Sequence, residues 1–215
     1  MKKELLVLFM IFSVVSLPAQ EIKKLFVTMP DTLVPLLTPV NRADFVDFLE
    51  SNMRARVKNK FENLSEMTDL TPDYIRLQMT LQSTLQMKLL AINDTAKVIC
   101  AVFTACAPEC DSYIRFFATD WKELPVQDYL TLLPKPDDFF LPPDSAYIGE
   151  YGYDSMCTQI DMVLLKADLS KTDTTLSFTF ITPRYMGEET LNKWKGYLRE
   201  VIVYEWKDGR FQSVK

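Results

Sequence analysis

The sequence predicts an α+β fold that is mainly antiparallel sheet with a few packed helices. Strand-length runs rich in aromatic and β-branched residues fill much of the chain from residue 74 onward. Several of these runs are joined by short turns, which connect antiparallel neighbours and not parallel ones. Apolar residues at helical spacing are confined to two segments, so the helices should be few.

The first helix is expected over residues 42–54. Asn41 has the character of an N-cap, and Asp44 follows three residues later. Residues 21–40 contain three prolines, so short helical turns are expected there. The second helix is expected over 188–198. The apolar positions that carry the two helical patterns are Phe45, Phe48, Leu49 and Met53, then Leu191, Trp194 and Leu198.

The expected strands follow from alternation and from continuous apolar runs. They cover residues 74–81, 85–92, 97–105, 113–119, 160–167, 175–181, 201–207 and 210–214. In 175–181 aromatic and aliphatic residues alternate with Ser and Thr, which is typical of a half-buried strand. The Asp208-Gly209 pair predicts a tight turn that closes the last hairpin.

An internal repeat suggests two similar halves in tandem, 20–124 and 156–215, joined by a Pro-rich, acidic and aromatic crossover at 125–155. A shift of 75 residues superposes Met87 on Met162, Phe103 on Phe178 and Pro108 on Pro183. The second half would carry an inserted helix before its last strands. The alternative is that two antiparallel meanders share this pattern through composition alone. Either way, one compact unit is expected.

Residues 1–19 have the character of a signal peptide. Lys2 and Lys3 precede an apolar run at 5–15, and small or turn-forming residues lead to Ala19, the expected last residue removed. The alternative, an uncleaved anchor, needs roughly 20 apolar residues, more than this run supplies. No Cys follows the run, so a lipid-anchored form is not expected. The prediction is an exported chain, periplasmic or at the cell surface, without stable membrane insertion after cleavage.

Two of the four cysteines have the spacing of a cross-strand disulfide. If 97–105 and 111–119 form a hairpin, Cys106 and Cys110 are directly opposed, at a separation that a disulfide tolerates. The alternative is a pair of packed free thiols. Cys100 and Cys157 are expected to be small buried hydrophobic residues.

The composition excludes several chemistries. The chain has no histidine, which removes Ser-His and Cys-His nucleophile pairs and imidazole metal sites. The five glycines form no phosphate-binding loop, and no cofactor is expected. A net charge of -5 without a basic run argues against nucleic acid as a partner. A hydrolase that uses carboxylates alone stays open, since the 29 acidic residues could supply an opposed pair.

Within the crossover, acidic and aromatic side chains alternate over residues 137–153. As a binding loop, its aromatics would supply rigid contact area and its acids would select a cationic partner. As a structural connection, the same aromatics would pin it to the sheet. The candidate binding residues are Asp137, Asp138, Phe139, Phe140, Tyr147 and Tyr151.

Several stretches resemble one protein family. They are residues 41–45, 53–57, 70–74, 106–112, 114–116, 119–125 and 203–209, which read NRADF, MRARV, LTPDY, CAPECDS, IRF, TDWKELP and VYEWKDG. The chain resembles the domain-of-unknown-function family 3256 of Bacteroides-type bacteria, across the whole region after the signal. The resemblance implies an exported protein and brings no established activity or catalytic residue.

The resemblance also implies a modification, because such bacteria O-glycosylate exported proteins at Asp-Ser/Thr followed by a small or aliphatic residue or Thr. Five sites match, where average composition gives about one. The acceptor hydroxyls would be Thr32, Thr95, Ser145, Ser155 and Thr174. The alternative is turn chemistry, since Asp followed by Ser or Thr is favoured in loops.

The expected function is therefore a non-enzymatic binding module for an envelope protein, peptide or glycan. Export, the lack of a catalytic pattern and an aromatic-rich sheet motivate it. Its rivals are a carboxylate-based hydrolase, which needs two opposed acids in a pocket, and an envelope assembly or structural factor. The latter needs an exposed apolar patch or an open strand edge.

Overall fold

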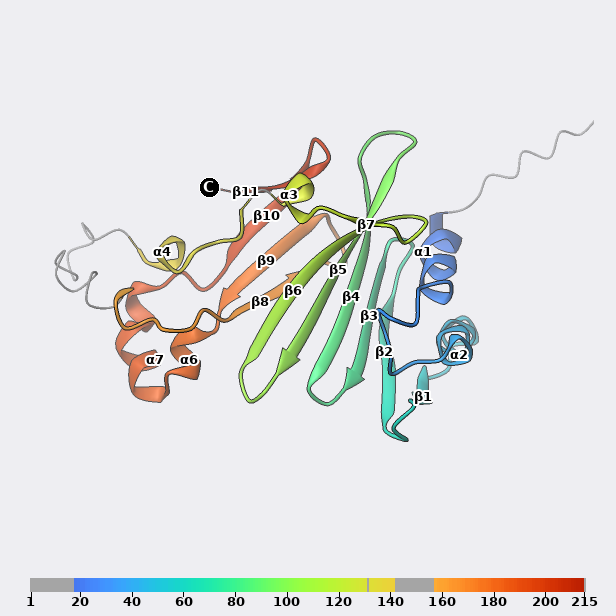
Figure 1. Cartoon of the computed structure of the whole chain (residues 1–215), viewed down its shortest axis with the longest axis horizontal. Coiled ribbons are helices and arrows are strands. Elements are labelled where there is room, and N and C mark those ends of the chain that lie inside the picture. The colour runs from blue at the N-terminus through green and yellow to red at the C-terminus, as the bar shows by residue number, and fades with distance from the viewer. Residues whose placement is uncertain (1–17, 131, 142–156, 215) are drawn as a thin grey trace, which may run out of the picture.

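The computed structural model describes residues 18–130, 132–141 and 157–214, and it confirms the α+β class. Two antiparallel sheets lie side by side at an angle, with helices at both ends of the molecule (Figure 1). The larger sheet has seven strands in chain order. They are β1 (Arg56–Lys58), β2 (Leu64–Leu70), β3 (Tyr74–Thr80), β4 (Ser83–Ala91), β5 (Lys97–Cys106), β6 (Cys110–Ala118) and β7 (Glu123–Leu124).

The smaller sheet has four strands in the order β11-β10-β9-β8. They are β8 (Leu165–Leu169), β9 (Thr175–Phe180), β10 (Ile202–Lys207) and β11 (Arg210–Ser213). The predicted strands after residue 70 are confirmed, except that β8 begins at Leu165 and not at 160. Strands β1 and β2 and the two-residue β7 were not predicted. Strands β1 and β7 are too short to show alternation, and charged and hydroxyl-bearing residues interrupt the apolar pattern of β2.

Two helices, α1 (Pro18–Val27) and α2 (Pro39–Glu50), cover one face of the large sheet. The crossover contains the short α3 (Val126–Tyr129) and α4 (Pro136–Phe139). Between β9 and β10 the chain forms α6 (Thr182–Tyr185), α7 (Glu188–Trp194) and a 3-10 turn, η1 (Lys195–Tyr197). This last insertion lies where the repeat hypothesis expects a helix, and the hypothesis itself stays a prediction. Among the described residues, no helix has the length and apolar character needed to cross a membrane.

The N-cap predicted at Asn41 is wrong. Thr38 caps α2: its Oγ1 accepts a hydrogen bond from the Asn41 N–H at 3.0 Å, and the Asn41 side chain accepts one from the Thr38 N–H at 3.1 Å. Asn41 is thus the returning partner of a capping box. The helix begins at Pro39, whose fixed φ suits a first helical position, and it ends at Glu50 and not at residue 54.

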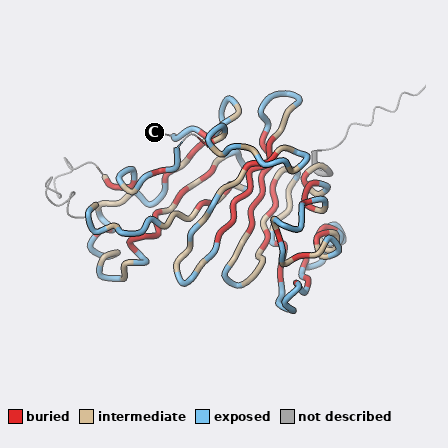
Figure 2. The backbone as a smooth tube through the Cα atoms, viewed as in Figure 1, coloured by how far each residue is buried: buried red, intermediate tan, exposed pale blue. Residues whose placement is uncertain are grey.

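Most of strand β4 is buried (Figure 2), because α1 and α2 pack against one of its faces and the small sheet packs against the other. Its residues Leu85, Met87 and Leu89 pack with α1 and α2, whereas Leu90 belongs to the core shared with the small sheet. Because side chains alternate along a strand, Gln86 and Lys88 also face the small sheet, and both are fully buried.

The buried Gln86 joins the two sheets. Its Oε1 accepts hydrogen bonds from the Tyr74 hydroxyl at 3.2 Å and from the Leu169 N–H at 2.8 Å, and its Nε2 donates to Asp168 at 2.9 Å. Burial in this contact raises the pKa of Tyr74 to about 12. Both Oε1 and Nε2 of this amide are therefore hydrogen-bonded, as a buried polar group requires.

Lys88 is held in the same layer. Its Nζ lies 3.1 Å from Asp73 Oδ2, donates to the Ser170 carbonyl at 3.1 Å, and sits 5.7 Å from the centre of the Tyr74 ring. A buried ammonium is tolerated only when it is paired and hydrogen-bonded, and these partners supply both conditions.

Strand β8 is an edge strand whose outward N–H groups are capped by side chains of the large sheet. The N–H groups of Leu165, Ala167 and Leu169 donate to Asp111, Ser112 and Gln86, at 3.0, 3.0 and 2.8 Å. The edge therefore has no free donors at these positions for pairing with another chain. The capping also fixes where the small sheet docks.

The predicted disulfide joins Cys106 and Cys110. The predicted hairpin register is confirmed as well, with Thr104 opposite Ser112 and Cys100 opposite Phe116. Cys100 is buried, as expected, and burial raises the pKa of its thiol. Cys157 is half-buried and not a core residue, because its sulfur lies near the surface, 3.5 Å from Asp137 Oδ1.

We predict that Gln86→Ala destabilises the fold by about 2–3 kcal/mol, since the Leu169 N–H and the Tyr74 hydroxyl would lose their buried partner. Urea unfolding followed by circular dichroism measures the change. Gln212→Ala, on the exposed β11, is the matched control and should stay within about 0.5 kcal/mol. Equal effects at the two sites would contradict the role assigned to Gln86.

We also predict that acid weakens the contact between the sheets through Asp69. Lys171, after β8, donates to Asp69 of β2 at 2.6 Å and holds the pKa of that carboxyl below its ordinary value of 3.8. The contribution of the Lys171–Asp69 pair to the free energy of unfolding is therefore present above pH 3.8. It is lost as the pH falls through the lowered pKa of Asp69 in the folded state. In urea unfolding from pH 7 to pH 2, Asp69→Asn should show a smaller loss of stability in that window than the unchanged chain.

Candidate binding groove

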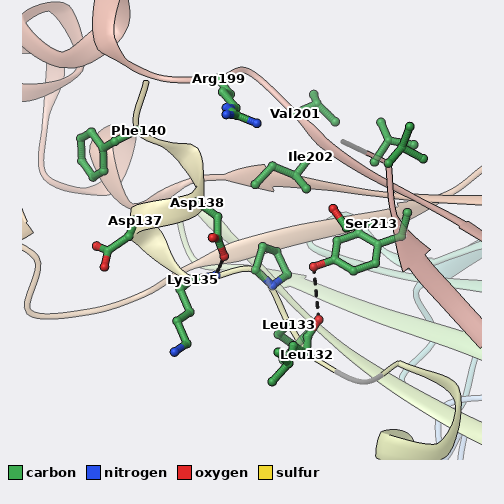
Figure 3. Close-up of a pocket in the computed structure, with 14 residues that line it drawn as sticks. Leu132, Leu133, Lys135, Asp137, Asp138, Phe140, Arg199, Val201, Ile202 and Ser213 are labelled. Carbon is green, nitrogen blue, oxygen red and sulfur yellow. Dashed lines mark hydrogen bonds between the residues drawn. The ribbon is translucent and has the colours of Figure 1, made fainter. Parts of the chain in front are cut away.

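A groove of about 740 Å³ lies between the crossover and the small sheet (Figure 3). One wall is the crossover from Leu132 to Phe140. The other is formed by Val201, by residues 202–204 at the start of β10, and by Ser213 and Val214 at the end of β11. Within this second wall, Ile202 and Tyr204 are buried.

The far end of the crossover is anchored by two buried phenylalanines. Phe139 stacks on Phe180 of β9 with ring centres 5.2 Å apart, and Phe140 meets Trp194 of α7 edge-on at 5.6 Å. The backbone reinforces the contact, because the Arg199 N–H donates to the Phe139 carbonyl at 2.7 Å. The exposed fractions are 0% for Phe139 and 4% for Phe140, so their rings do not reach the surface.

The near end of the crossover is anchored on β11 and β10. Leu130 is buried and forms a parallel bridge with Phe211, and the Tyr204 hydroxyl donates to the Leu132 carbonyl at 3.2 Å. Burial raises the pKa of Tyr204, and the charge of Asp138 adds to the shift. Between these two anchors the crossover is separated from the small sheet, and this separation forms the groove.

Exposed aliphatic side chains surround the groove. Leu132 is 68% exposed, Leu133 52%, Val214 51% and Val201 43%. Single exposed apolar residues are ordinary on a protein surface, but here four of them gather around one concavity.

The charged groups of the groove differ in how they are paired. Asp138 Oδ2 accepts a hydrogen bond from the Lys135 N–H at 2.7 Å, at the start of α4. Within the part of the chain that the structure describes, the Arg199 guanidinium has no ion-pair partner. Figure 3 shows this side chain at the rim, extending toward the side occupied by Val201. As far as the described residues show, the groove thus presents a cation without an ion-pair partner beside an apolar surface.

Comparison with known proteins decides the family. Residues 14–211 match the family described as "Protein of unknown function (DUF3256)". The chain belongs to this family. A solved domain of an uncharacterized protein from Porphyromonas gingivalis W83 has 26% identity and a TM-score of 0.76, and the match covers 90% of this chain and 98% of that one. No curated protein matches the chain. The resemblance drawn from the sequence is confirmed, and the function of this DUF3256 member has to be argued from its own geometry.

The structure brings some of the predicted binding residues to the groove and not others. Asp137, Asp138 and Phe140 line it, whereas Phe139 lies fully in the core. Tyr147 and Tyr151 fall outside the described residues. For Phe139 and Phe140 the structural alternative applies, because their rings pin the crossover to the sheet and cannot contact a partner at the surface.

Sequence reasoning missed Arg199 and the aliphatic rim. The Leu132-Leu133 pair in a Pro-rich connection was the one available signal. Arg199, Val201 and Val214 gave none, because they reach the groove only through contacts between distant parts of the chain.

Of the predicted glycosylation acceptors in this DUF3256 chain, Thr32, Thr95 and Thr174 are exposed in turns. Ser145 and Ser155 lie outside the described residues. Modification at these sites stays a prediction. Among the described residues, no three Cys, Asp or Glu side chains gather as a metal site would require.

We predict that Phe139→Ala destabilises the fold by about 3–5 kcal/mol, the cost of removing a fully buried aromatic ring. Leu133→Ala, on the exposed rim of the same crossover, should change the stability by less than about 0.5 kcal/mol. Urea unfolding measures both. A small effect at Phe139 would show that the crossover is not anchored by this ring.

Proposed function

We propose that this chain is a non-enzymatic binding module that works outside the cytoplasm and holds an extended polypeptide segment in the groove. The observation that carries the proposal is Arg199, which has no ion-pair partner among the described residues, beside four exposed aliphatic side chains. The location outside the cytoplasm is inferred from the predicted signal peptide and the predicted export.

The size and lining of the groove fit a binding site. Ligand sites are concave, occupy roughly 300–1,000 Å³ and combine an apolar surface with a few polar groups. Burial of apolar area contributes about 25 cal/mol per Å², so Leu132, Leu133 and Val214 could supply most of the affinity. Their aliphatic side chains suit the side chains of a peptide and offer no flat aromatic face for a sugar ring.

Arg199 would select the sequence that binds. A guanidinium recognises a carboxylate through two parallel hydrogen bonds, and no described acid forms an ion pair with Arg199, although Asp137 and Asp138 line the same groove. An acidic side chain or a C-terminal carboxylate next to aliphatic residues is the chemistry that this surface complements.

The end of β11 supports an extended backbone in the ligand. The Val214 N–H donates to the Val203 carbonyl at 2.9 Å, toward β10. Backbone groups alternate in direction along a strand, so the N–H and C=O of Ser213 point away from β10 and are positioned to pair with an added chain.

The hydrolase alternative has less support at this site. It needs two opposed carboxylates, but Asp137 and Asp138 are adjacent in sequence and their side chains diverge in Figure 3. Asp138 is also engaged with the Lys135 backbone, which orders the first turn of α4.

The test is to pan a peptide library with the domain lacking residues 1–19 and to measure the affinity of selected peptides by fluorescence anisotropy. We expect peptides with aliphatic residues next to a carboxylate. Arg199→Gln should weaken their binding about tenfold or more, the loss of one charge-assisted hydrogen-bonded pair.

Leu133→Asp should abolish binding, because it places a charge on the apolar wall. Arg184→Gln, an exposed arginine of α6 outside the groove, is the matched control and should bind as the unchanged chain does. If Arg199→Gln and Leu133→Asp both bind selected peptides normally, the groove is not the site.

A further inference from the structure

A second exposed apolar surface lies at one end of the large sheet, away from the groove. Three turns meet there: 59–63 between β1 and β2, 81–82 between β3 and β4, and 107–109 between β5 and β6. They occupy the lower ends of these strands in Figure 1. We name them the turn surface.

Hydrogen bonds tie the three turns into one unit. The Asn59 side chain donates to Ser65 Oγ at 3.1 Å, and Ser65 Oγ donates to the Met79 carbonyl next to the second turn at 2.6 Å. The Cys106 N–H of the third turn donates to the Gln82 carbonyl of the second at 2.9 Å. The surface is therefore held in place by the sheet.

Two large apolar side chains project from the turn surface. Leu81 is 100% exposed and Phe61 is 71% exposed. Leu64, where β2 begins, is 58% exposed. Among the described residues, the Leu81 side chain makes no packing contribution to this fold and is fully available to a contact outside it.

Several backbone polar groups of these turns are hydrogen-bonded within the chain. Asn59 Oδ1 accepts from the Phe61 N–H at 3.0 Å, and Thr80 Oγ1 accepts from the Gln82 N–H at 3.1 Å. The Gln78 side chain donates to the Ser83 carbonyl at 3.3 Å. Unsatisfied N–H and C=O groups are the main obstacle to placing backbone in an apolar phase. These hydrogen bonds lower the free-energy cost of doing so.

The shape of the turn surface favours a lipid bilayer over a folded protein as the partner. A stable protein interface buries about 800 Å² on each side with matched shape, which projecting turns with two or three apolar side chains do not offer. A bilayer needs no preformed complementary pocket and takes single side chains into its interface.

The charges fit a zwitterionic surface. Lys58 pairs with Glu62 at 3.2 Å, and Lys60 and Glu109 bring one further charge of each sign to the turns. Attraction to anionic lipid would need an excess of Lys and Arg. We infer that the turn surface adsorbs reversibly to phospholipid bilayers, with Leu81 and Phe61 entering the interface. This adsorption needs no spanning segment and does not rest on the groove.

The test uses the domain lacking residues 1–19 and vesicles of pure phosphatidylcholine. Sedimentation with vesicles measures the bound fraction, and a Leu81→Trp variant reports its own environment by fluorescence. We expect the added emission of Leu81→Trp to shift to shorter wavelength with lipid. Leu81→Asp and Phe61→Asp should each lower the partition coefficient about tenfold or more.

Met162→Asp is the matched control, an exposed apolar residue next to the small sheet, and should bind as the unchanged chain does. Because Leu81 and Phe61 are exposed, their variants should retain the circular dichroism spectrum. No binding by the unchanged chain, or equal binding by Leu81→Asp, would overturn the inference. So would binding confined to anionic vesicles and abolished by high salt, which would mark an electrostatic contact instead.

Discussion

The side-chain amide of Gln86 lies between the two sheets and bonds to both, and the arrangement of the small sheet depends on this contact. Gln86 lies on β4, and the opposite face of this strand packs against α1 and α2. Apolar packing alone would allow the small sheet to slide across the large one, because dispersion and burial have little direction. Gln86, with Asp111 and Ser112, accepts hydrogen bonds from the outward N–H groups of β8, so the observed placement pairs these donors.

This placement determines where the groove forms. Because the small sheet docks through its edge strand β8, much of the inner face of β10 and β11 extends beyond the large sheet (Figure 1). The crossover covers that face and is fixed at Leu130 and at Phe139, but it cannot follow the sheet closely between these points. Pro134 and Pro136 lack backbone N–H groups, which removes two of the donors that continuous strand pairing would use. The concavity is thus a consequence of how the layers are joined.

The sequence predicted most elements that are stabilised by local patterns, and few that depend on distant contacts. Alternation identified the central strands, and the spacing of Cys106 and Cys110 fixed the register of β5 and β6 correctly. The start of α2 was misplaced because Asn41 can act as either member of a cap, and only the geometry shows that Thr38 is the other. Strand β2 has charged or hydroxyl-bearing residues at four of its seven positions, so it lacks the apolar signal. The groove could not be predicted in full, because Arg199 and Val214 become neighbours of Leu132 only once the sheets have docked.

The two proposed surfaces differ in the physics of what they can hold. The groove is concave, lies between the crossover and the small sheet, and contains a cation that no described acid pairs with, so it can discriminate between ligands by shape and charge. The turn surface is built from projecting turns of the large sheet and has paired or balanced charges, so it can distinguish only an apolar interface from water. Since the Gln86 contact holds the two sheets in one orientation, a chain adsorbed through its turns would present the groove in a fixed direction relative to the bilayer. The adsorbed chain would then search for its ligand along the membrane surface. Because diffusion is confined to two dimensions there, a modest affinity of the groove would suffice for binding.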